Sequence, residues 1–347
     1  MEIYNQYINF STKNSVKLNS NEAFIDIDEN IRMEIKNALN TMEFNRYPLN
    51  DLNEIKKLYA KYANVRLENI IVGNGSDELL ELVIGKIITY DKKVLTLGPD
   101  FVMYDFFTNR FKGNIIKYNI KENLKFNVNK FIEFGKKENV DLIVFSNPNN
   151  PTGVAISEKE IVKILNAFND KPVIVDEAYY EFNGESVVSY INEYKNLIVT
   201  RTLSKAWGLA AIRIGFLIAD EERILSLMNE KIPYTISSFS KIVAEIVLRY
   251  PDKPVKNAKI IAEQRESLYE QLKNIQKEAA LHIEFFKSKS NYIYGKTKHK
   301  EILLKGLDCS GIYIRNFDDD GFRITVGSPR QNKELIEALK KIFVYKN

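Results

Sequence analysis

The sequence predicts an α/β fold with a mostly parallel central sheet, followed by a smaller α+β domain at the C-terminal end. Between residues 70 and 220, short apolar runs alternate with amphipathic helical patterns. Such runs are typical of strands that are buried on both faces, and intervening helices imply parallel connections. Beyond about residue 255 the pattern changes to one long charged helix and several short strands, which indicates a second domain.

The apolar runs define the expected elements in order. Seven of them predict the strands of the main sheet, at residues 70–72, 94–97, 115–118, 142–145, 173–175, 197–200 and 214–219. Helical periodicity is clearest at 77–88 and 158–168, and the long charged helix spans 255–278. The strands of the smaller domain are expected within 283–286, 290–295, 311–317 and 322–327.

A chain of 347 residues exceeds the usual size of one domain, so a large and a small domain are expected. We expect residues 41–250 to form the large domain and residues 251–347 the small one. The polar N-terminal segment, residues 1–40, is expected to pack with the small domain.

Composition argues against several functional classes. The 50 basic and 46 acidic residues are mixed along the chain without a basic stripe, so no nucleic-acid partner is expected. The two histidines, His282 and His299, are far apart, which argues against a metal site or a Ser–His–Asp triad. A single cysteine, Cys309, suits a reducing compartment. The chain has no apolar run of the ~20 residues that a membrane span requires, and a cytoplasmic protein is expected.

Polar motifs follow three consecutive strands of the predicted sheet. SNPNNPTG comes after 142–145, DEAYYEF after 173–175 and RTLSKAWGLAAIRIGF after 197–200. Ligands of open α/β sheets bind beyond the carboxyl ends of the strands. Each motif alone has an ordinary structural explanation, as a turn, a helix cap or a solvated lysine. Their succession on neighbouring strand ends predicts an active site.

These motifs resemble those of the fold type I aminotransferases (class I and II), which use pyridoxal 5′-phosphate (PLP). Within that family the chain is most similar to the histidinol-phosphate aminotransferases. The resemblance covers nearly the whole chain and rests on KLNSNE, RYP, GNGSDE, SNPNNPTG, VDEAYYEF, TLSKAWGLAAIRIGF, GIYIRNF and FRITVG. It implies a large PLP-binding domain with a mostly parallel sheet and a smaller α+β C-terminal domain.

The chemistry of PLP suits the residues of these motifs. The cofactor aldehyde requires a lysine amine, and Lys205 in TLSK is the candidate; the same amine then serves as the catalytic base. PLP withdraws electrons only while its ring nitrogen is protonated, which requires a carboxylate partner, and Asp176 fits that role. By resemblance, Tyr179 and Asn150 would donate hydrogen bonds to the ring 3-oxygen.

The phosphate of the cofactor requires a helix N-terminus and a cation. Gly75, Ser76 and Asp77 lie between a strand and an apolar helix, so their backbone amides can meet a phosphate. An N-cap role for Ser76 or Asp77 is compatible with this function. Ser204 and Arg213 would complete the phosphate site by resemblance.

Two aromatic residues have alternative interpretations. Phe101 in GPDFVMY corresponds to the aromatic residue that stacks on the cofactor ring, although a core aromatic after a strand would look the same. Tyr47 in RYP resembles the tyrosine that reaches the PLP phosphate of the neighbouring subunit, which implies a homodimer with shared active sites. An ordinary turn residue before a proline is the alternative for Tyr47.

The substrate is expected to meet arginines of the smaller domain. Arg323 in FRITVG matches the arginine that binds a substrate carboxylate or phosphate as a planar fork. Arg315, in GIYIRNF, is expected to bind the substrate phosphate, unless ion pairs with the acidic turn at 318–320 occupy it. Asn21 in SNE and Asn150 complete the expected substrate contacts.

The expected reaction is transamination of L-histidinol phosphate with 2-oxoglutarate, giving imidazole acetol phosphate and L-glutamate. The chain departs from the family pattern in lacking a Pro-Tyr element near its start and in having Ala23-Phe24 after SNE. A threonine-phosphate decarboxylase and an aromatic-amino-acid aminotransferase therefore remain alternatives. A non-catalytic protein of the same fold is disfavoured because Lys205 and Asp176 are both present.

Overall fold

The computed structural model describes residues 15–48, 51–120 and 124–344. The described residues divide into a large unit, Ile25–Lys259, and a small unit formed by residues 15–24 together with 260–344. The unit boundaries differ from the domain boundaries expected at residues 40 and 250. The expected division into domains at those residues stays a prediction.

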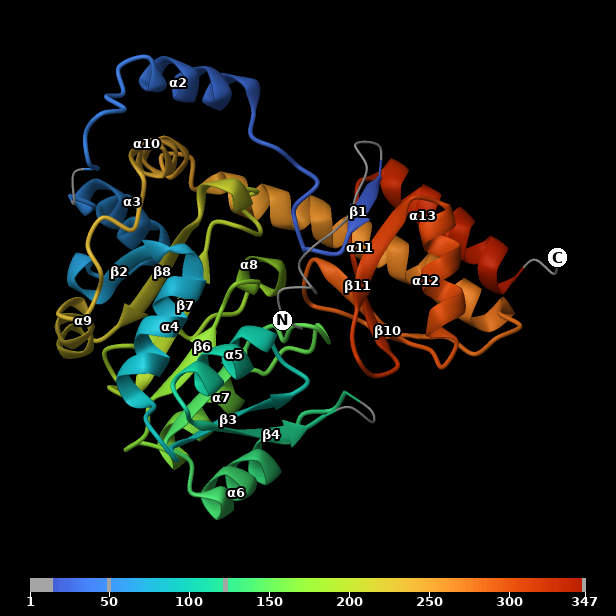
Figure 1. The fold of residues 1–347 in the computed structure, drawn as a ribbon, viewed down its shortest axis with the longest axis horizontal. Helices are drawn as coiled ribbons and strands as arrows, with labels where there is room; N and C mark the ends of the chain where they lie inside the picture. Colours follow the sequence, from blue (N-terminus) through green and yellow to red (C-terminus); the bar gives the residue numbers. More distant parts are fainter. Residues whose placement is uncertain (1–14, 49–50, 121–123, 345–347) are drawn as a thin grey trace. The chain divides into compact units, whose positions relative to one another are not determined.

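A seven-stranded sheet forms the centre of the large unit (Figure 1). The strand order is β2-β8-β7-β6-β5-β3-β4, and only β8 runs antiparallel to its neighbours. Every predicted strand is confirmed, each end within two residues. The strands are β2 (Ile70–Asn74), β3 (Lys93–Gly98), β4 (Asn114–Asn119), β5 (Leu142–Ser146), β6 (Val173–Asp176), β7 (Leu197–Thr202) and β8 (Ile214–Ala219).

Side-chain alternation along these strands divides the large unit into two buried layers. In β3, for example, Leu95 belongs to one apolar cluster and Val94 to the other. The first cluster includes α2 (Glu29–Leu39), α3 (Asn53–Ala63), α6 (Val128–Glu138), α7 (Glu158–Ala167) and α10 (Ser238–Val247). The second includes α4 (Gly75–Ile87), α5 (Val102–Arg110) and α9 (Glu221–Met228). Helices on both faces explain why the strands are continuously apolar.

Local signals set the ends of several elements. A capping box between Ser157 and Glu160 begins α7, and Gly184, with φ of 82°, ends the short α8 (Tyr180–Asn183). Three 3₁₀ turns complete the unit, at Leu67–Asn69, Val188–Tyr190 and Ala210–Ile212.

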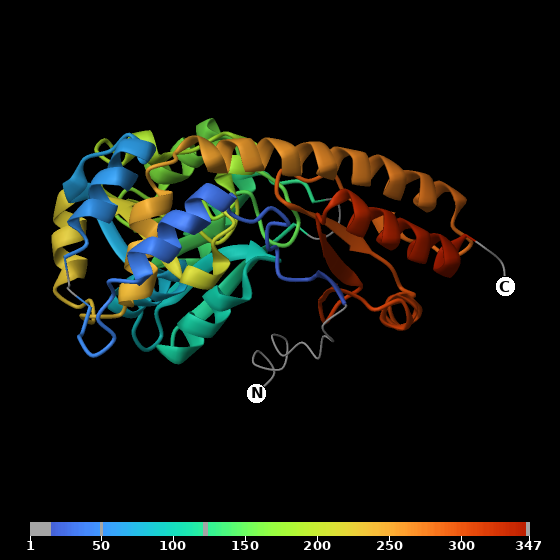
Figure 2. The same ribbon diagram turned by 90° about the horizontal axis from the view of Figure 1, so that it is seen from above.

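The small unit contains a five-stranded sheet of order β1-β11-β12-β10-β9. Its strands are β1 (Val16–Leu18), β9 (Glu284–Phe285), β10 (Tyr292–Lys296), β11 (Ile312–Asn316) and β12 (Gly321–Thr325), and its helices include α12 (Lys300–Cys309) and α13 (Pro329–Phe343). The three-residue β1 was not predicted; it pairs in parallel with β11. The long helix α11 (Asp252–Glu278) is uninterrupted and contains the unit boundary (Figure 2). It begins three residues before the predicted position.

No helix among the described residues is long and apolar enough to cross a membrane. Within the same ranges, no group of three or more His, Cys, Asp or Glu side chains is placed to hold a metal ion.

Candidate active site

A cavity lies at the carboxyl ends of the parallel strands of the large unit. It contains about 510 Å³ of empty space, part of it open to solvent. Strands β5 and β6 contribute their last residues to it, Ser146 and Asp176. The predicted site residues that line it are Ser76, Asp77, Phe101, Asn150, Asp176, Tyr179, Ser204, Lys205 and Arg213.

Lys205 follows β7 in a tight turn. The backbone amide of Gly208 donates to the carbonyl of Lys205, and that of Leu209 donates to the carbonyl of Leu203. Leu203 and Ala206 are fully buried, whereas Lys205 is only partly buried. The turn therefore anchors its apolar side chains in the core and leaves Lys205 at the cavity, with Nζ 5.7 Å from the ring centre of Tyr179.

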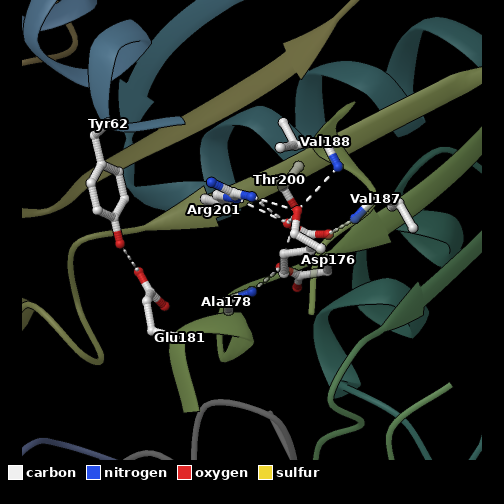
Figure 3. Close-up of polar contacts among 10 residues, drawn as sticks. Tyr62, Asp176, Ala178, Glu181, Val187, Val188, Thr200 and Arg201 are labelled. Carbon is white, nitrogen blue, oxygen red and sulfur yellow. Dashed lines mark hydrogen bonds and ion pairs between the residues drawn. The ribbon is translucent and has the colours of Figure 1, made fainter. Parts of the chain in front are cut away.

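Asp176 is a buried carboxyl whose orientation is determined by three donors. The Tyr104 hydroxyl donates to Oδ2 at 2.8 Å, the Thr200 hydroxyl to Oδ1 at 3.0 Å and the Ala178 amide to Oδ1 at 3.3 Å (Figure 3 shows Thr200 and Ala178). Burial raises the pKa of Asp176 to about 6, although the bonds from Tyr104 and Thr200 act in the opposite direction. A cationic group in the cavity would lower that pKa again, so the site favours a positive partner for Asp176.

Sequence reasoning missed Tyr104 and Thr200. Tyr104 is on α5, one turn after Phe101, and its ring packs edge-on against Phe101 with ring centroids 5.6 Å apart. Its buried position near Asp176 raises the pKa of its phenol well above the ordinary value. Thr200 pairs with Asp176 in the parallel β6–β7 register. The only signal in the sequence was a polar residue, Thr200, within the otherwise apolar run 197–200.

The N-terminus of α4 forms a cradle for an anion. The helix begins at Gly75, where φ is 76°, and a side chain there would lie 2.7 Å from Arg213 Nη2. Arg213 donates to the Ser204 hydroxyl at 3.2 Å and pairs with Asp77 at 3.2 Å. Free helix amides and a guanidinium together bind phosphate well. A similar close approach occurs at Gly215 of β8, where a Cβ atom would lie 2.3 Å from the Ser76 amide nitrogen.

The adjacent residues of β6 and β7 form a separate buried network. Glu177 accepts from Arg201 Nε at 2.9 Å, from the Ser186 hydroxyl at 2.8 Å and from the Val187 amide at 2.8 Å (Figure 3 shows Arg201 and Val187). The Arg201 guanidinium lies 3.7 Å from the centre of the Tyr180 ring. The motif DEAYYEF thus supplies Asp176 to the cavity and Glu177 to the core.

The remaining predicted cofactor residues are at different positions. Asn150 and Tyr179 are buried at the cavity, and Phe101 is partly buried there. Gly75 is adjacent to the cavity, beside Ser76. Tyr47 is not part of the cavity lining; its side chain is 86% exposed, with its ring 5.9 Å from that of Tyr234. Its proposed contact with a neighbouring subunit stays a prediction.

The predicted substrate residues of the small unit occupy one sheet. Arg315 of β11 and Arg323 of β12 are direct cross-strand partners, and Arg323 donates to the carbonyl of Asn19 at 2.7 Å. Asn21 is buried, with φ of 53°. Its backbone amide donates to the Thr325 hydroxyl, and that hydroxyl donates to the side-chain oxygen Oδ1 of Asn21 at 3.1 Å. Asn21 is therefore bonded to the strand that carries Arg323, although 304 residues separate it from Thr325 in the chain.

Comparison with known proteins agrees with this geometry. The family model for aminotransferase class I and II matches residues 13–339. A histidinol-phosphate aminotransferase of Clostridium novyi (strain NT) is 38% identical over 332 residues, which cover 94% of this chain and 92% of the relative.

Solved structures show the same fold. The histidinol-phosphate aminotransferase of Sinorhizobium meliloti, in complex with PLP, superposes with a TM-score of 0.84 at 19% identity over 94% of this chain and 90% of that one. The L-threonine-O-3-phosphate decarboxylase of Porphyromonas gingivalis gives 0.78 at 20% identity, over 94% and 98%. These likenesses concern the fold, whereas the sequence match identifies the group. The chain belongs to the class I and II aminotransferases, which are PLP-dependent enzymes, and within them to the histidinol-phosphate aminotransferase family.

Proposed function

We propose that the chain catalyses the transamination of L-histidinol phosphate with 2-oxoglutarate, giving imidazole acetol phosphate and L-glutamate in histidine biosynthesis. The observation that carries the proposal is a single cavity that combines Lys205, Asp176 and the N-terminus of α4. The 38% identity to a histidinol-phosphate aminotransferase supports the choice of substrate over a decarboxylase, which shares only the fold.

PLP, when bound, supplies an aldehyde that a lysine amine can bind and a ring that withdraws electrons from the substrate. Lys205 is assigned to that covalent bond and to proton transfer at the substrate carbon that carries the amino group. Its position at the cavity, between buried residues, keeps the amine in place for both tasks.

Asp176 is assigned to the ring nitrogen of the cofactor. Its buried carboxylate is oriented by Tyr104 and Thr200, and a protonated ring nitrogen would supply the opposite charge that the buried group otherwise lacks. Tyr179 and Asn150 are assigned to the ring 3-oxygen, and Phe101 to one face of the ring.

The cofactor phosphate is assigned to the anion cradle. Gly75, Ser76 and Asp77 contribute the beginning of α4, while Ser204 and Arg213 contribute a hydroxyl and a guanidinium. Asp77 pairs with Arg213 at 3.2 Å, so its carboxylate holds the guanidinium at the cavity edge.

Substrate anions are assigned to Arg315 and Arg323. Like charges on directly opposite residues of neighbouring strands repel each other, and an anion that binds both offsets that repulsion. Asn21 and Asn150 are assigned to further polar contacts with the substrate. The acidic turn at 318–320 remains the competing partner for Arg315.

The proposal includes a homodimer that acts in the cytoplasm. The exposed ring of Tyr47 is available to a second subunit, where we assign it to the PLP phosphate. The low cysteine usage, with Cys309 alone, suits a reducing compartment.

Visible absorbance and an amino-donor panel test the proposal. The purified protein should be yellow, and borohydride reduction should attach PLP to the peptide that contains Lys205. Among histidinol phosphate, tyrosine, phenylalanine and threonine phosphate, histidinol phosphate should give the highest kcat/KM. Label at another lysine would refute the assignment of Lys205, and release of carbon dioxide from threonine phosphate would favour the decarboxylase.

A further inference from the structure

The proposed mechanism does not use the carboxyl of Asp100, which bonds to two residues that line the cavity, Phe101 and Ser146. Asp100 lies between β3 and α5, directly before Phe101, and is partly buried. Its Oδ1 accepts from the Phe101 amide at 2.8 Å and from the Ser146 hydroxyl. Its Oδ2 accepts from the Ser146 amide at 3.2 Å and from the Thr96 hydroxyl at 3.4 Å.

Ser146 connects Asp100 to the rest of the motif SNPNNPTG through hydrogen bonds. The Ser146 hydroxyl is part of the cavity lining, and its oxygen accepts from the backbone amide of Asn150 at 2.8 Å. That oxygen accepts a hydrogen bond from the Asn150 amide, and the hydroxyl donates its own proton in a hydrogen bond to Asp100. The three groups therefore form a chain of hydrogen bonds from Asp100 through Ser146 to Asn150.

A second bond joins the same two loops. The Asn149 side chain donates to the carbonyl of Pro99 at 3.2 Å. The turn that carries Asn150 is thus held to the Pro99–Asp100 segment at two places.

We propose that Asp100 is a positioning residue for the cofactor site, which holds Asn150 in place through the Ser146 hydroxyl. The inference rests on the proposed function, because it assumes that Asn150 contacts PLP.

Two features of its surroundings favour the neutral form. Asp176 carries the negative charge that the cofactor nitrogen requires, and that charge disfavours ionisation of Asp100. Burial of the carboxyl raises the pKa of Asp100 to about 8, while the hydrogen bonds from Ser146 and Phe101 act in the opposite direction. Oδ1 accepts the bonds from Ser146 and Phe101 in either state, while a proton on Oδ2 can bond to the Thr96 oxygen.

An asparagine at position 100 resembles the neutral acid in shape and charge. In Asp100→Asn, Oδ1 still accepts from the Ser146 hydroxyl and the Phe101 amide, and it also lies 3.4 Å from the Ser146 amide nitrogen. The side-chain nitrogen takes the place of Oδ2 beside Thr96 and loses only the bond that Oδ2 accepts from the Ser146 amide at 3.2 Å. Asp100→Ala removes all of these bonds. The two variants therefore separate a requirement for shape and hydrogen bonding from a requirement for charge.

The test is the PLP dissociation constant, measured by visible absorbance at pH 7 without substrate. Asp100→Ala should weaken PLP binding on the order of tenfold, as expected for a lost buried hydrogen bond. Asp100→Asn should remain within about threefold of the parent chain. Ser146→Ala should match Asp100→Ala, and the double variant should be no weaker than either single one, since both changes break the same chain of bonds.

Asp105→Ala is the matched control. Asp105 is an acid on α5 that pairs with Lys117 at the surface, at 2.6 Å, and its loss should leave PLP binding unchanged. The inference is overturned if Asp100→Ala binds PLP as tightly as the parent, if Asp100→Asn is as weak as Asp100→Ala, or if the Asp100 and Ser146 effects add. If Asp100→Ala does not fold, Ser146→Ala and Asp100→Asn decide by the same criteria. A parent chain that does not bind PLP would instead refute the proposed function.

Discussion

At the scale of single residues, the site depends on the buried carboxyl of Asp176. Ionisation of this carboxyl is unfavourable unless a cation binds beside it. Asp176 is nearly inaccessible to solvent, and its pKa of about 6 lies above the ordinary value of 3.8. An acid with a raised pKa in the folded state stabilises the fold while it is protonated, and that contribution is lost as the pH rises through the folded pKa. In the apoprotein, the ionised Asp176 therefore destabilises the fold, and a positively charged ring nitrogen would offset that destabilisation.

Asp176→Asn should therefore act in opposite directions on stability and catalysis. In the apoprotein, the variant should gain stability relative to the parent as the pH rises from 4 to 8, by up to about 3 kcal/mol. Turnover should fall far more than PLP binding, because the neutral amide does not keep the ring nitrogen protonated. Thermal unfolding of the apoproteins at pH 4 and pH 8 measures the first effect, and kcat the second. Near-normal turnover would exclude Asp176 as the partner of the ring nitrogen.

Arg315→Ala should separate the two half-reactions. Glutamate brings a carboxylate for which Arg323 suffices, whereas the phosphate of histidinol phosphate can use both arginines. We expect a loss of ~1.5–3 kcal/mol in kcat/KM for histidinol phosphate and a much smaller change for glutamate. Arg323→Ala should impair both half-reactions. A lower melting temperature with unchanged kinetics would indicate that Arg315 serves the acidic turn instead.

At the scale of elements, the parallel register of β6 and β7 arranges two polar pairs. Asp176 pairs with Thr200 in that register, and each residue is followed by a member of the buried ion pair Glu177–Arg201. The side chains of Glu177 and Arg201 are only 1% and 3% exposed. Because successive side chains of a strand point to opposite faces, the ion pair stabilises the strand ends without entering the cavity.

Breaking this ion pair on one side should be costly. Glu177→Gln leaves the Arg201 charge buried without its carboxylate, so we expect a loss of about 3–5 kcal/mol in the free energy of unfolding. Removing both charges in Glu177→Gln/Arg201→Met should cost less than the sum of the single changes. Chemical denaturation measures both values.

A surface pair provides the control for this comparison. Arg66 and Glu221 are 3.3 Å apart, compared with 2.8 Å for Arg201 and Glu177, and their side chains are 59% and 46% exposed. Glu221→Gln should change stability by no more than about 1 kcal/mol. Equal costs for the two pairs would show that burial does not determine the contribution of Glu177 and Arg201.

At the scale of the whole molecule, the proposed dimer makes each active site composite. Tyr47 belongs to the large unit, and its ring is available at the surface rather than in the cavity of its own chain. A cofactor phosphate that is bound by one subunit and contacted by Tyr47 of the other would link dimer assembly to cofactor affinity.

Subunit mixing tests this arrangement. Tyr47→Phe and Lys205→Ala chains should each be poorly active, but a heterodimer places both changes in one site and leaves the other intact. Activity should therefore reappear on mixing, to be measured after the heterodimer has been isolated with two different affinity tags. An isolated heterodimer without recovered activity would show that Tyr47 acts within its own subunit or has no role.

Much of the fold follows from local signals in the sequence. The seven strands of the large sheet are found within two residues of their predicted ends, because a continuous apolar run bounded by turn residues reflects burial on both faces. Most of the expected cofactor residues share one cavity for a related reason, since parallel strands in succession bring their carboxyl ends to one edge.

Contacts between distant segments required the tertiary structure. The bonds of Tyr104 to Asp176 and of Asp100 to Ser146 join positions 72 and 46 residues apart, and no periodicity in the sequence indicates such partners. The pairing of β1 with β11 and the alignment of Arg315 with Arg323 also required the tertiary structure. Strand register is set by packing between segments, and a shift of one residue moves every side chain to the other face of the sheet. The sequence by itself determined the elements and the chemical groups of the site; the tertiary structure determined which buried side chains orient those groups, because orientation depends on packing between residues that are remote in the chain.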